Sequence, residues 1–239
     1  MSIEKKPKPF KGRTPRGVFR YLALHKPDYG NEAFPIPYGV YKVQVILSEA
    51  QAAPLLKTLE PIHTQAIEEG EAAFKELKVD ARKNLKQITV QDLFAVEYDK
   101  ETEEPTGNLI FSFMMQASGL SSQNGMTSTW KRSPNIFDAK GKLLTGKLPE
   151  ICDGTLGIVA FTALPYFISG LGMAGIILML EAVQIIELRS GDKRSAADYG
   201  FVEEDGWSAP EEPENLILKA LEALIVKVEY LSIATHPTE

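Results

Sequence analysis

The side chains of this chain that could do chemistry are cations and aromatic rings distributed along the sequence. Binding a single nucleic acid strand without sequence preference needs cations that contact phosphates and aromatic faces on which bases stack. The candidate cations are Arg16, Arg20, Lys26, Lys42, Lys131 and Arg132, and the candidate stacking residues are Tyr38, Trp130 and Tyr166. Because each of these rings could equally belong to a core, the pattern indicates a class of ligand and no more.

Signals for catalysis or for a bound metal are missing from the sequence. The three histidines are His25, His63 and His236, and none neighbours a second ligand at the spacing that a metal site needs. The single cysteine, Cys152, excludes an internal disulfide and a cysteine-based zinc site, which suits a reducing cytosol. The chain has no phosphate-binding loop and no Gly-x-Ser-x-Gly elbow. We therefore expect no enzyme activity, no metal and no cofactor.

One glycine-rich run allows a different interpretation. Residues 170–175 fit the Gly-x-Gly-x-x-Gly pattern after an apolar segment, as in a dinucleotide-binding fold. No alternation of strands and helices follows, so a hairpin loop between two strands is favoured over a nucleotide-binding enzyme. Residues 154–180 also carry no charge and are long enough to span a bilayer. Because Pro165, Tyr166 and several glycines interrupt this stretch, two buried strands are predicted there and no membrane segment.

The charge is distributed unevenly, although the net charge is only −6. The first twenty-six residues contain eight cations and a single acid, whereas residues 198–214 contain seven acids and no base. A basic arm and an acidic segment on one chain predict a polyanionic ligand and a competitor for it. Solubilising tails at the two ends are the alternative interpretation.

Apolar periodicity predicts a largely β body. Strands are expected at residues 16–24, 41–47, 94–98, 109–117, 127–137, 156–168 and 176–188. In the second of these strands, Tyr41, Val43, Val45 and Leu47 share one side. Lys-Pro-Asp-Tyr-Gly at residues 26–30 is predicted to be a turn, because proline fixes φ and glycine tolerates a positive φ.

The remaining segments are predicted to be helical or irregular. Ser48 is a good N-cap for a helical insertion at about residues 48–77, either one helix or a pair broken near Pro61. Residues 1–11 are expected to be a disordered basic arm and residues 78–90 a loop. Residues 190–239 combine an acidic linker with an apolar stretch at residues 216–233, whose periodicity predicts a helix.

Four segments together resemble a known family. They are residues 24–32 followed by Tyr38-Gly39-Val40-Tyr41-Lys42-Val43, residues 136–142, Ala163-Leu164-Pro165-Tyr166, and residues 177–188. In order and spacing they resemble the single-stranded-DNA-binding proteins of short-tailed coliphages, a viral family built on an OB-fold. The resemblance covers residues 12–189 and implies an OB-type β-barrel there, with the helix as an insertion.

The resemblance also implies a function. It is the coating of single-stranded DNA during phage DNA replication and recombination in the host cytoplasm, with the phage DNA polymerase and the helicase/primase as partners. The family's stacking tyrosine corresponds to Tyr166. The family's acidic C-terminus competes with DNA and docks partners. Here that role would either fall to the acidic segment or be lost. The residues concerned are Asp198, Phe201, Glu203, Glu204, Asp205 and Trp207.

The chain also departs from the family pattern. A basic residue before Gly-Val-Tyr-Lys is replaced by Tyr38, and a lysine and a tyrosine are replaced by Met114 and Gln116. The run Trp130-Lys131-Arg132 is a candidate replacement for these contacts. The apolar stretch at residues 216–233 could dock on the body or form a homodimer interface. A structural phage protein that assembles through this stretch therefore stays open as an alternative function.

Overall fold

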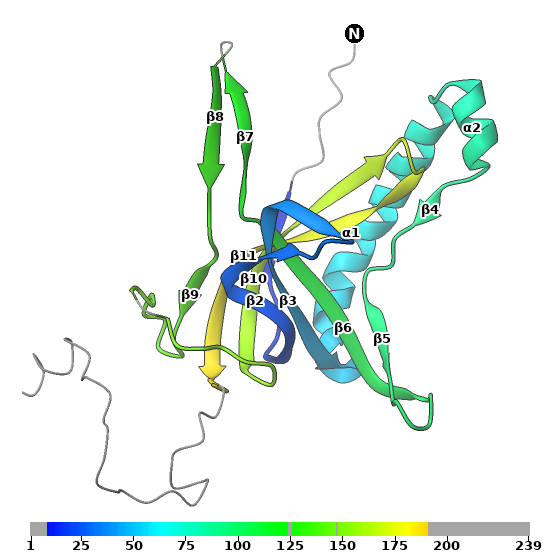
Figure 1. Cartoon of the computed structure of the whole chain (residues 1–239). Coiled ribbons are helices and arrows are strands. Elements are labelled where there is room, and N and C mark those ends of the chain that lie inside the picture. The colour runs from blue at the N-terminus through cyan, green and yellow to red at the C-terminus, as the bar shows by residue number, and fades with distance from the viewer. Residues whose placement is uncertain (1–8, 124–125, 147, 191–239) are drawn as a thin grey trace, which may run out of the picture. The chain divides into compact units, whose positions relative to one another are not determined.

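The structure is a computed structural model and describes residues 9–123, 126–146 and 148–190 (Figure 1). The elements in chain order are β1 (Phe10–Arg13), β2 (Gly17–Gly30), β3 (Pro35–Ser48), α1 (Glu49–Lys75), α2 (Val79–Leu85), β4 (Thr89–Val90), β5 (Ala95–Tyr98), β6 (Pro105–Gln116), β7 (Ser118–Gln123), β8 (Met126–Lys131), β9 (Asn135–Phe137), β10 (Leu156–Ile168) and β11 (Met173–Glu187). The predictions for residues 1–8 and for the C-terminal acidic and apolar segments lie outside the described residues.

The sheet closes on itself. Strands β10, β2, β3, β6 and β11 are hydrogen-bonded in that order, and β11 pairs back with β10. The pairings of β11 with β4, β6 and β9 are parallel and the others are antiparallel. Closure leaves no free edge within this ring of strands. The prediction of a mainly β barrel with an inserted helix is confirmed.

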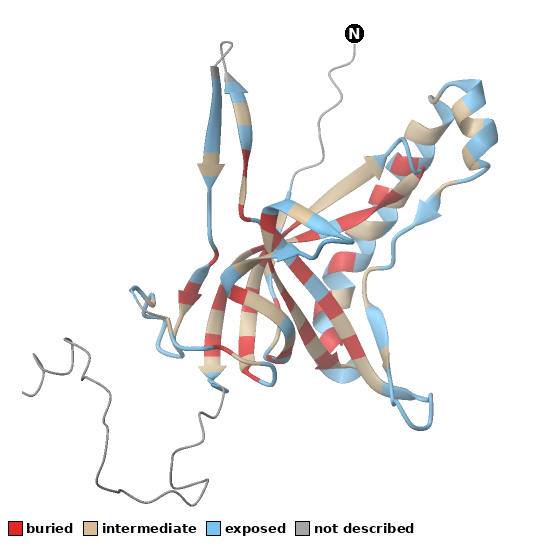
Figure 2. Cartoon of the chain, viewed as in Figure 1, coloured by how far each residue is buried: buried red, intermediate tan, exposed pale blue. Residues whose placement is uncertain are grey.

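The barrel core follows from strict alternation in β3 and β6. Tyr41, Val43, Val45 and Leu47 of β3 are buried, as their spacing predicts. Opposite them, Leu109, Phe111, Phe113 and Met115 of β6 are also buried. Figure 2 shows buried and more exposed residues alternating along the barrel strands. The intervening side chains must therefore form the outer face of the barrel.

The inserted helix α1 is a single helix. Ser48 accepts a hydrogen bond from the backbone N–H of Gln51, whose side chain reaches back to the N–H of Ser48. This capping box satisfies two N–H groups at the helix start. Pro61 lies inside the helix without breaking it, and its side chain is exposed. Gly70 contacts the sheet so closely that a Cβ there would lie 2.4 Å from the Cβ of Ala174 on β11.

The prediction of a disordered arm at residues 1–11 was wrong for its last two residues. Phe10 and Lys11 belong to β1, which pairs with β10. The ring of Phe10 lies with its centroid 6.3 Å from that of Phe161, so this side chain has apolar surface to bury. The composition of the arm did not show that its single aromatic residue has a partner more than a hundred residues away.

The predicted turn at residues 26–30 lies inside β2. The Asp28 carboxylate accepts the N–H of Gly30 at 2.8 Å, and Gly30 has a φ of +74°. The turn chemistry is therefore present, but Gly30 still pairs with Pro35, and the chain reverses at residues 31–34. Register shifts in the β2–β3 pairing absorb these local distortions.

Two further segments differ from the prediction. Residues 78–90 were expected to be a loop, but they contain α2 and β4. Residues 127–137 were expected to be one strand, but they form β8 and β9, which are separated at residues 132–134 by a stretch that includes Pro134. Strand β7, which pairs with β8, was not predicted, because its serines and glycine carry no apolar alternation.

The glycine-rich run at residues 170–175 is a hairpin, as predicted. Ile168 pairs with Met173, and the turn between them contains Gly172 with a φ of +62°. The uncharged stretch around it forms β10 and β11. Among the described residues, no helix is both long enough and apolar enough to cross a membrane.

Candidate nucleic-acid interface

The outer face of the barrel carries a row of side chains across β3, β6 and β11. Lys42 of β3 lies opposite Met114 of β6, and Met114 lies opposite Met179 of β11. The side chains of Met114 and Ile177 are 49% and 42% exposed, which is high for apolar residues in a sheet. This row brings a predicted cation next to an exposed apolar surface.

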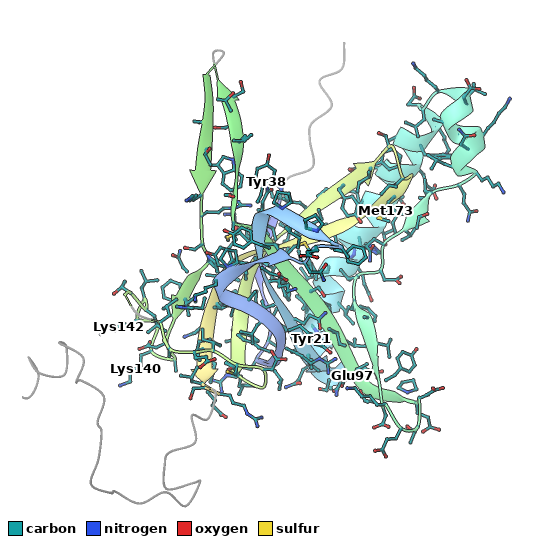
Figure 3. All side chains as sticks on the ribbon, in the orientation of Figure 1. Tyr21, Tyr38, Glu97, Lys140, Lys142 and Met173 are labelled. Atoms are coloured by element: carbon teal, nitrogen blue, oxygen red, sulfur yellow. The ribbon has the colours of Figure 1, made fainter. Side chains whose placement is uncertain are left out.

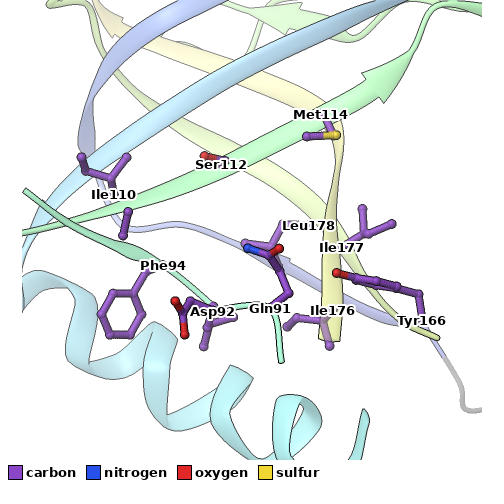
Figure 4. Close-up of a pocket in the computed structure, with 12 residues that line it drawn as sticks. Gln91, Asp92, Phe94, Ile110, Ser112, Met114, Tyr166, Ile176, Ile177 and Leu178 are labelled. Carbon is purple, nitrogen blue, oxygen red and sulfur yellow. The ribbon is translucent and has the colours of Figure 1, made fainter. Parts of the chain in front are cut away.

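Tyr166 lies at one side of this face, in an open cavity of about 420 Å³ that we call the Tyr166 groove (Figure 4). The groove is lined by Gln91, Asp92, Leu93, Phe94, Ala95, Ile110, Ser112, Met114, Tyr166, Ile176, Ile177 and Leu178. Tyr166 pairs with Gly175 across β10 and β11, and partial burial raises the pKa of its hydroxyl. A half-buried ring at the edge of an apolar groove is suited to stacking with a flat ligand.

The hairpin of β7 and β8 carries the predicted Trp130-Lys131-Arg132 run. It forms a sheet of its own and extends away from the barrel in Figure 1. The Nε of Arg132 donates to the carbonyl of Gln116 at 2.8 Å, which ties the base of the hairpin to the end of β6. The guanidinium of Arg132 lies 5.0 Å from the ring centroid of Trp130. These two residues therefore form one stacked unit, while Lys131 is exposed.

Tyr38 lies near the same end of the face. Its side chain is 43% exposed, and its carbonyl accepts a hydrogen bond from the hydroxyl of Ser118, the first residue of β7 (Figure 3). The next outward residue of β3, Val40, is paired with Gln116. Tyr38, Gln116 and the Trp130–Arg132 unit thus lie close to one another, as the sequence could not show.

Lys42 already has a protein partner. Its Nζ lies 2.5 Å from Oδ2 of Asp28. The hydrogen bond from Lys42, together with the backbone N–H of Gly30, lowers the pKa of Asp28. Both side chains are partly exposed, so the pair is accessible to a competing anion. Binding of a phosphate to Lys42 would replace the Asp28 contact.

Arg20 has a structural partner as well. Its Nη1 lies 2.6 Å from Oε1 of Glu97 on β5, and the Glu97 carboxylate also accepts hydrogen bonds from Asn108 and Thr106. The hydrogen bond from Asn108 is the main cause that lowers the pKa of Glu97, and the Arg20 contacts act in the same direction. The Arg20 cation thus helps to hold β5 onto the barrel.

This network predicts a pH dependence of stability. The pKa of Glu97 is lower in the folded state than its ordinary value of 4.5, so its charged form stabilises the fold above that pH. The stabilisation is lost as the pH falls below about 4.5 and through the lowered pKa. Glu97→Gln should lower the free energy of unfolding by about 1 kcal/mol at neutral pH and by less in acid. Urea unfolding at a series of pH values measures this difference, and a difference independent of pH would contradict it.

Arg16 and Lys26 lie apart from the Tyr166 groove. Arg16 is exposed in the connection between β1 and β2. Lys26 lines a different cavity, together with Leu22, His25 and Glu150. The predicted residues of the acidic segment lie outside the described residues. Tyr38, Trp130 and Arg132 thus lie near the end of β6, and Lys42 lies opposite Met114 of the Tyr166 groove. Arg20 is paired with Gln44, which lies opposite Ser112 of the groove, but its cation is bound to Glu97.

Sequence reasoning missed one wall of the groove. Residues 91–95 form it, and they are placed by long-range backbone contacts such as the N–H of Gln91 to the carbonyl of Ala174 at 2.9 Å. The segment has neither a clear period nor a motif. Its last two residues, Phe94 and Ala95, belong to the predicted strand at residues 94–98, but nothing in that strand indicates a groove.

Comparison with known proteins identifies one family, whose model matches most of the chain. The family model of the single-stranded DNA-binding protein of bacteriophage T7 matches residues 17–188. The crystal structure of gp2.5, a single-stranded DNA-binding protein encoded by bacteriophage T7, aligns over 85% of this chain and 100% of its own, with a TM-score of 0.55 and 24% identity. The single-stranded DNA-binding protein of bacteriophage Enc34 in complex with ssDNA aligns over 77% of this chain and 88% of its own, with a TM-score of 0.45 and 11% identity.

The comparison with curated proteins found no match. The likeness to gp2.5 confirms the expected OB-type barrel. The matching family consists of DNA-binding proteins rather than enzymes, as the absence of catalytic motifs predicted.

Proposed function

Because this chain belongs to the family of bacteriophage T7-type single-stranded DNA-binding proteins, we propose that it coats single-stranded DNA through phosphate contacts and base stacking. The observation that carries the proposal is the Tyr166 groove. It places a half-exposed aromatic ring beside exposed apolar side chains, and Met114 in its lining lies opposite the cation of Lys42.

The two kinds of contact have separate places on the face. Bases stack on Tyr166 and contact the apolar side chains of Met114 and Ile177 in the groove. Phosphates bind Lys42 and the basic end of the β7–β8 hairpin, where Lys131 and Arg132 lie. Tyr38 and the Trp130–Arg132 unit offer further stacking surfaces at this end. Arg20 contributes through the fold rather than through the ligand.

Membership of the family supports a proposal for the biological role. The protein protects and straightens single-stranded DNA during phage DNA replication and recombination in the host cytoplasm. The phage DNA polymerase and the helicase/primase are its proposed partners, and the acidic segment at residues 198–214 is the proposed competitor of DNA.

Fluorescence anisotropy of a labelled single-stranded oligonucleotide over a series of salt concentrations tests the proposed binding mode. Each neutralised phosphate releases counterions, so the logarithm of the association constant should fall linearly with the logarithm of the salt concentration. Binding that does not weaken with salt would contradict the phosphate contacts. Absence of binding at low salt would contradict the function itself.

Removal of two charges on the hairpin tests the phosphate path. The double variant Lys131→Gln, Arg132→Gln should reduce the salt slope by about 1.4, since each contact to a single strand contributes about 0.7. Lys57→Gln with Lys83→Gln is the matched control, because these exposed lysines lie on α1 and α2. An unchanged slope in the hairpin variant would refute the assignment, and Arg132→Lys separates loss of charge from loss of the Trp130 contact.

Release of Lys42 from its ion pair is expected to have the opposite effect. Asp28→Asn removes the competing carboxylate but keeps an acceptor for the N–H of Gly30. The free Lys42 should then bind a phosphate more strongly, which raises the affinity and steepens the salt slope by up to about 0.7. The same titration measures both quantities, and an affinity and a slope that both equal those of the wild type would contradict a phosphate contact at Lys42.

A further inference from the structure

The Tyr166 groove has a polar wall as well as an apolar floor. Ile176 and Leu178 line it, together with the amide of Gln91 and the carboxylate of Asp92. In Figure 4 the hydroxyl of Tyr166 points toward the side chain of Gln91, and Asp92 lies between Gln91 and Phe94. A base stacked on Tyr166 would therefore have the amide of Gln91 near its edge, and Asp92 lies farther along the groove, toward Phe94.

The backbone of this wall is held in place. The N–H of Gln91 donates to the carbonyl of Ala174, and the carbonyl of Gln91 lies 2.7 Å from Nε2 of His63 on α1. Gly175 allows this close approach, since a Cβ there would lie 2.9 Å from the Cβ of Gln91. The wall is thus fixed to both the helix and β11. Side chains on a fixed backbone present their polar groups in a defined direction.

The polar groups of the wall are available to a ligand. Within residues 9–123, 126–146 and 148–190, no hydrogen bond joins the amide of Gln91, the carboxylate of Asp92 or the hydroxyl of Tyr166 to the protein. Asp92 also has no ion-pair partner among these residues. Asp92 is exposed, so its carboxylate is free to accept hydrogen bonds from a ligand and repels phosphates that come close to it.

Charge determines which part of the strand can face this wall. The phosphates are excluded from the side of Asp92 and attracted to the side of Lys42, which lies opposite Met114 of the groove. The base edges therefore face residues 91–95. The amide of Gln91 offers both a donor and an acceptor, whereas the carboxylate of Asp92 can only accept. The Asp92 carboxylate would accept a hydrogen bond from the exocyclic amino group of cytosine, adenine or guanine. Thymine has no amino group and offers only its N3–H, between carbonyl oxygens that the carboxylate repels.

We propose that Asp92 is a base-reading residue, which makes the groove favour bases with an exocyclic amino group over thymine. The proposal rests on the function proposed above and adds a preference that stacking alone does not supply. Stacking strength and backbone flexibility also differ between pyrimidines, so the part of a dC/dT difference that depends on Asp92 is the part that its replacement removes.

The test compares oligo-dC with oligo-dT of equal length by anisotropy, using the full chain. The wild type should bind oligo-dC about fivefold more tightly, a modest ratio for a hydrogen bond in an open groove. Asp92→Asn should bring this ratio close to one, because an amide can donate to thymine as well as accept from cytosine. Glu101→Gln, an equal change of charge on the exposed β5–β6 turn, should leave the ratio as in the wild type.

Each outcome separates the two proposals. If Asp92→Asn raises the affinity for both oligonucleotides by the same factor, Asp92 only repels phosphates and base reading is refuted, while the binding function stands. If the wild type binds both oligonucleotides equally, base reading is likewise refuted. If the wild type binds neither, both proposals fail.

Discussion

Replacement of Tyr166 by alanine is expected to weaken binding of single-stranded DNA by about 5- to 150-fold. Stacking of a base on an aromatic ring contributes about 1–3 kcal/mol, and 1.4 kcal/mol corresponds to a factor of ten. Tyr166 is the only tyrosine among the described residues that line the groove. Anisotropy titrations of the variant and the wild type with the same oligonucleotide measure the loss.

Two variants control this prediction. Tyr166→Phe keeps the ring and should bind with nearly the affinity of the wild type. Tyr98→Ala removes an exposed ring on β5 outside the groove and should leave binding unchanged. Thermal unfolding of all three variants shows whether they remain folded. A folded Tyr166→Ala variant that binds as tightly as the wild type would show that no base stacks on Tyr166.

Replacement of Phe161 by alanine should lower the free energy of unfolding by about 3–5 kcal/mol, a typical loss for a large core residue. Phe161 on β10 is 1% exposed, and its ring centroid lies 5.2 Å from that of Phe113 and 6.3 Å from that of Phe10. The change therefore leaves a cavity where β1, β6 and β10 meet. Urea unfolding followed by circular dichroism measures the effect.

Phe161→Leu keeps this prediction testable if the alanine variant does not fold. Its loss should be clearly smaller, because most of the apolar volume remains. Phe34→Ala is the matched surface control, since that ring is 78% exposed and its removal should change stability by less than about 0.5 kcal/mol. Equal urea midpoints for Phe161→Leu, Phe34→Ala and the wild type would show that the core is assigned wrongly.

The barrel strands could be predicted because each has one buried face. The alternation of Tyr41, Val43, Val45 and Leu47 is visible without any knowledge of the partner strand, and β10 begins and ends at the predicted residues. Ser48 predicts the helix that follows β3, because serine is a favoured N-cap residue and it comes directly after the strand pattern. These signals are local, and local patterns can be read from a single sequence.

The elements that the sequence did not predict depend on partners far along the chain. Strand β1 exists because β10 offers it a hydrogen-bonding edge and Phe161 a surface for Phe10. Strand β7 has no apolar alternation and is held by its pairing with β8. The helix at residues 79–85 was missed for another reason: none of its residues is buried, so it has no apolar face that a periodic pattern could reveal.

The candidate site was predictable in part. The resemblance to the phage family pointed to Tyr166, and the basic run at residues 130–132 lies at the end of the same face. The engagement of Arg20 by Glu97 was not visible, because 77 residues separate the two. Nor was the wall at residues 91–95, which depends on contacts with β11 and α1.

The face around Tyr166 is proposed to take a strand whose bases are free to stack. The affinity of the full chain for a single-stranded oligonucleotide, compared with its affinity for the same sequence as a duplex at one moderate salt concentration, tests this proposal. The single strand should bind at least about tenfold more tightly, since a duplex hides the base faces. Equal affinities would show that the protein recognises phosphates alone and that bases do not stack on Tyr166.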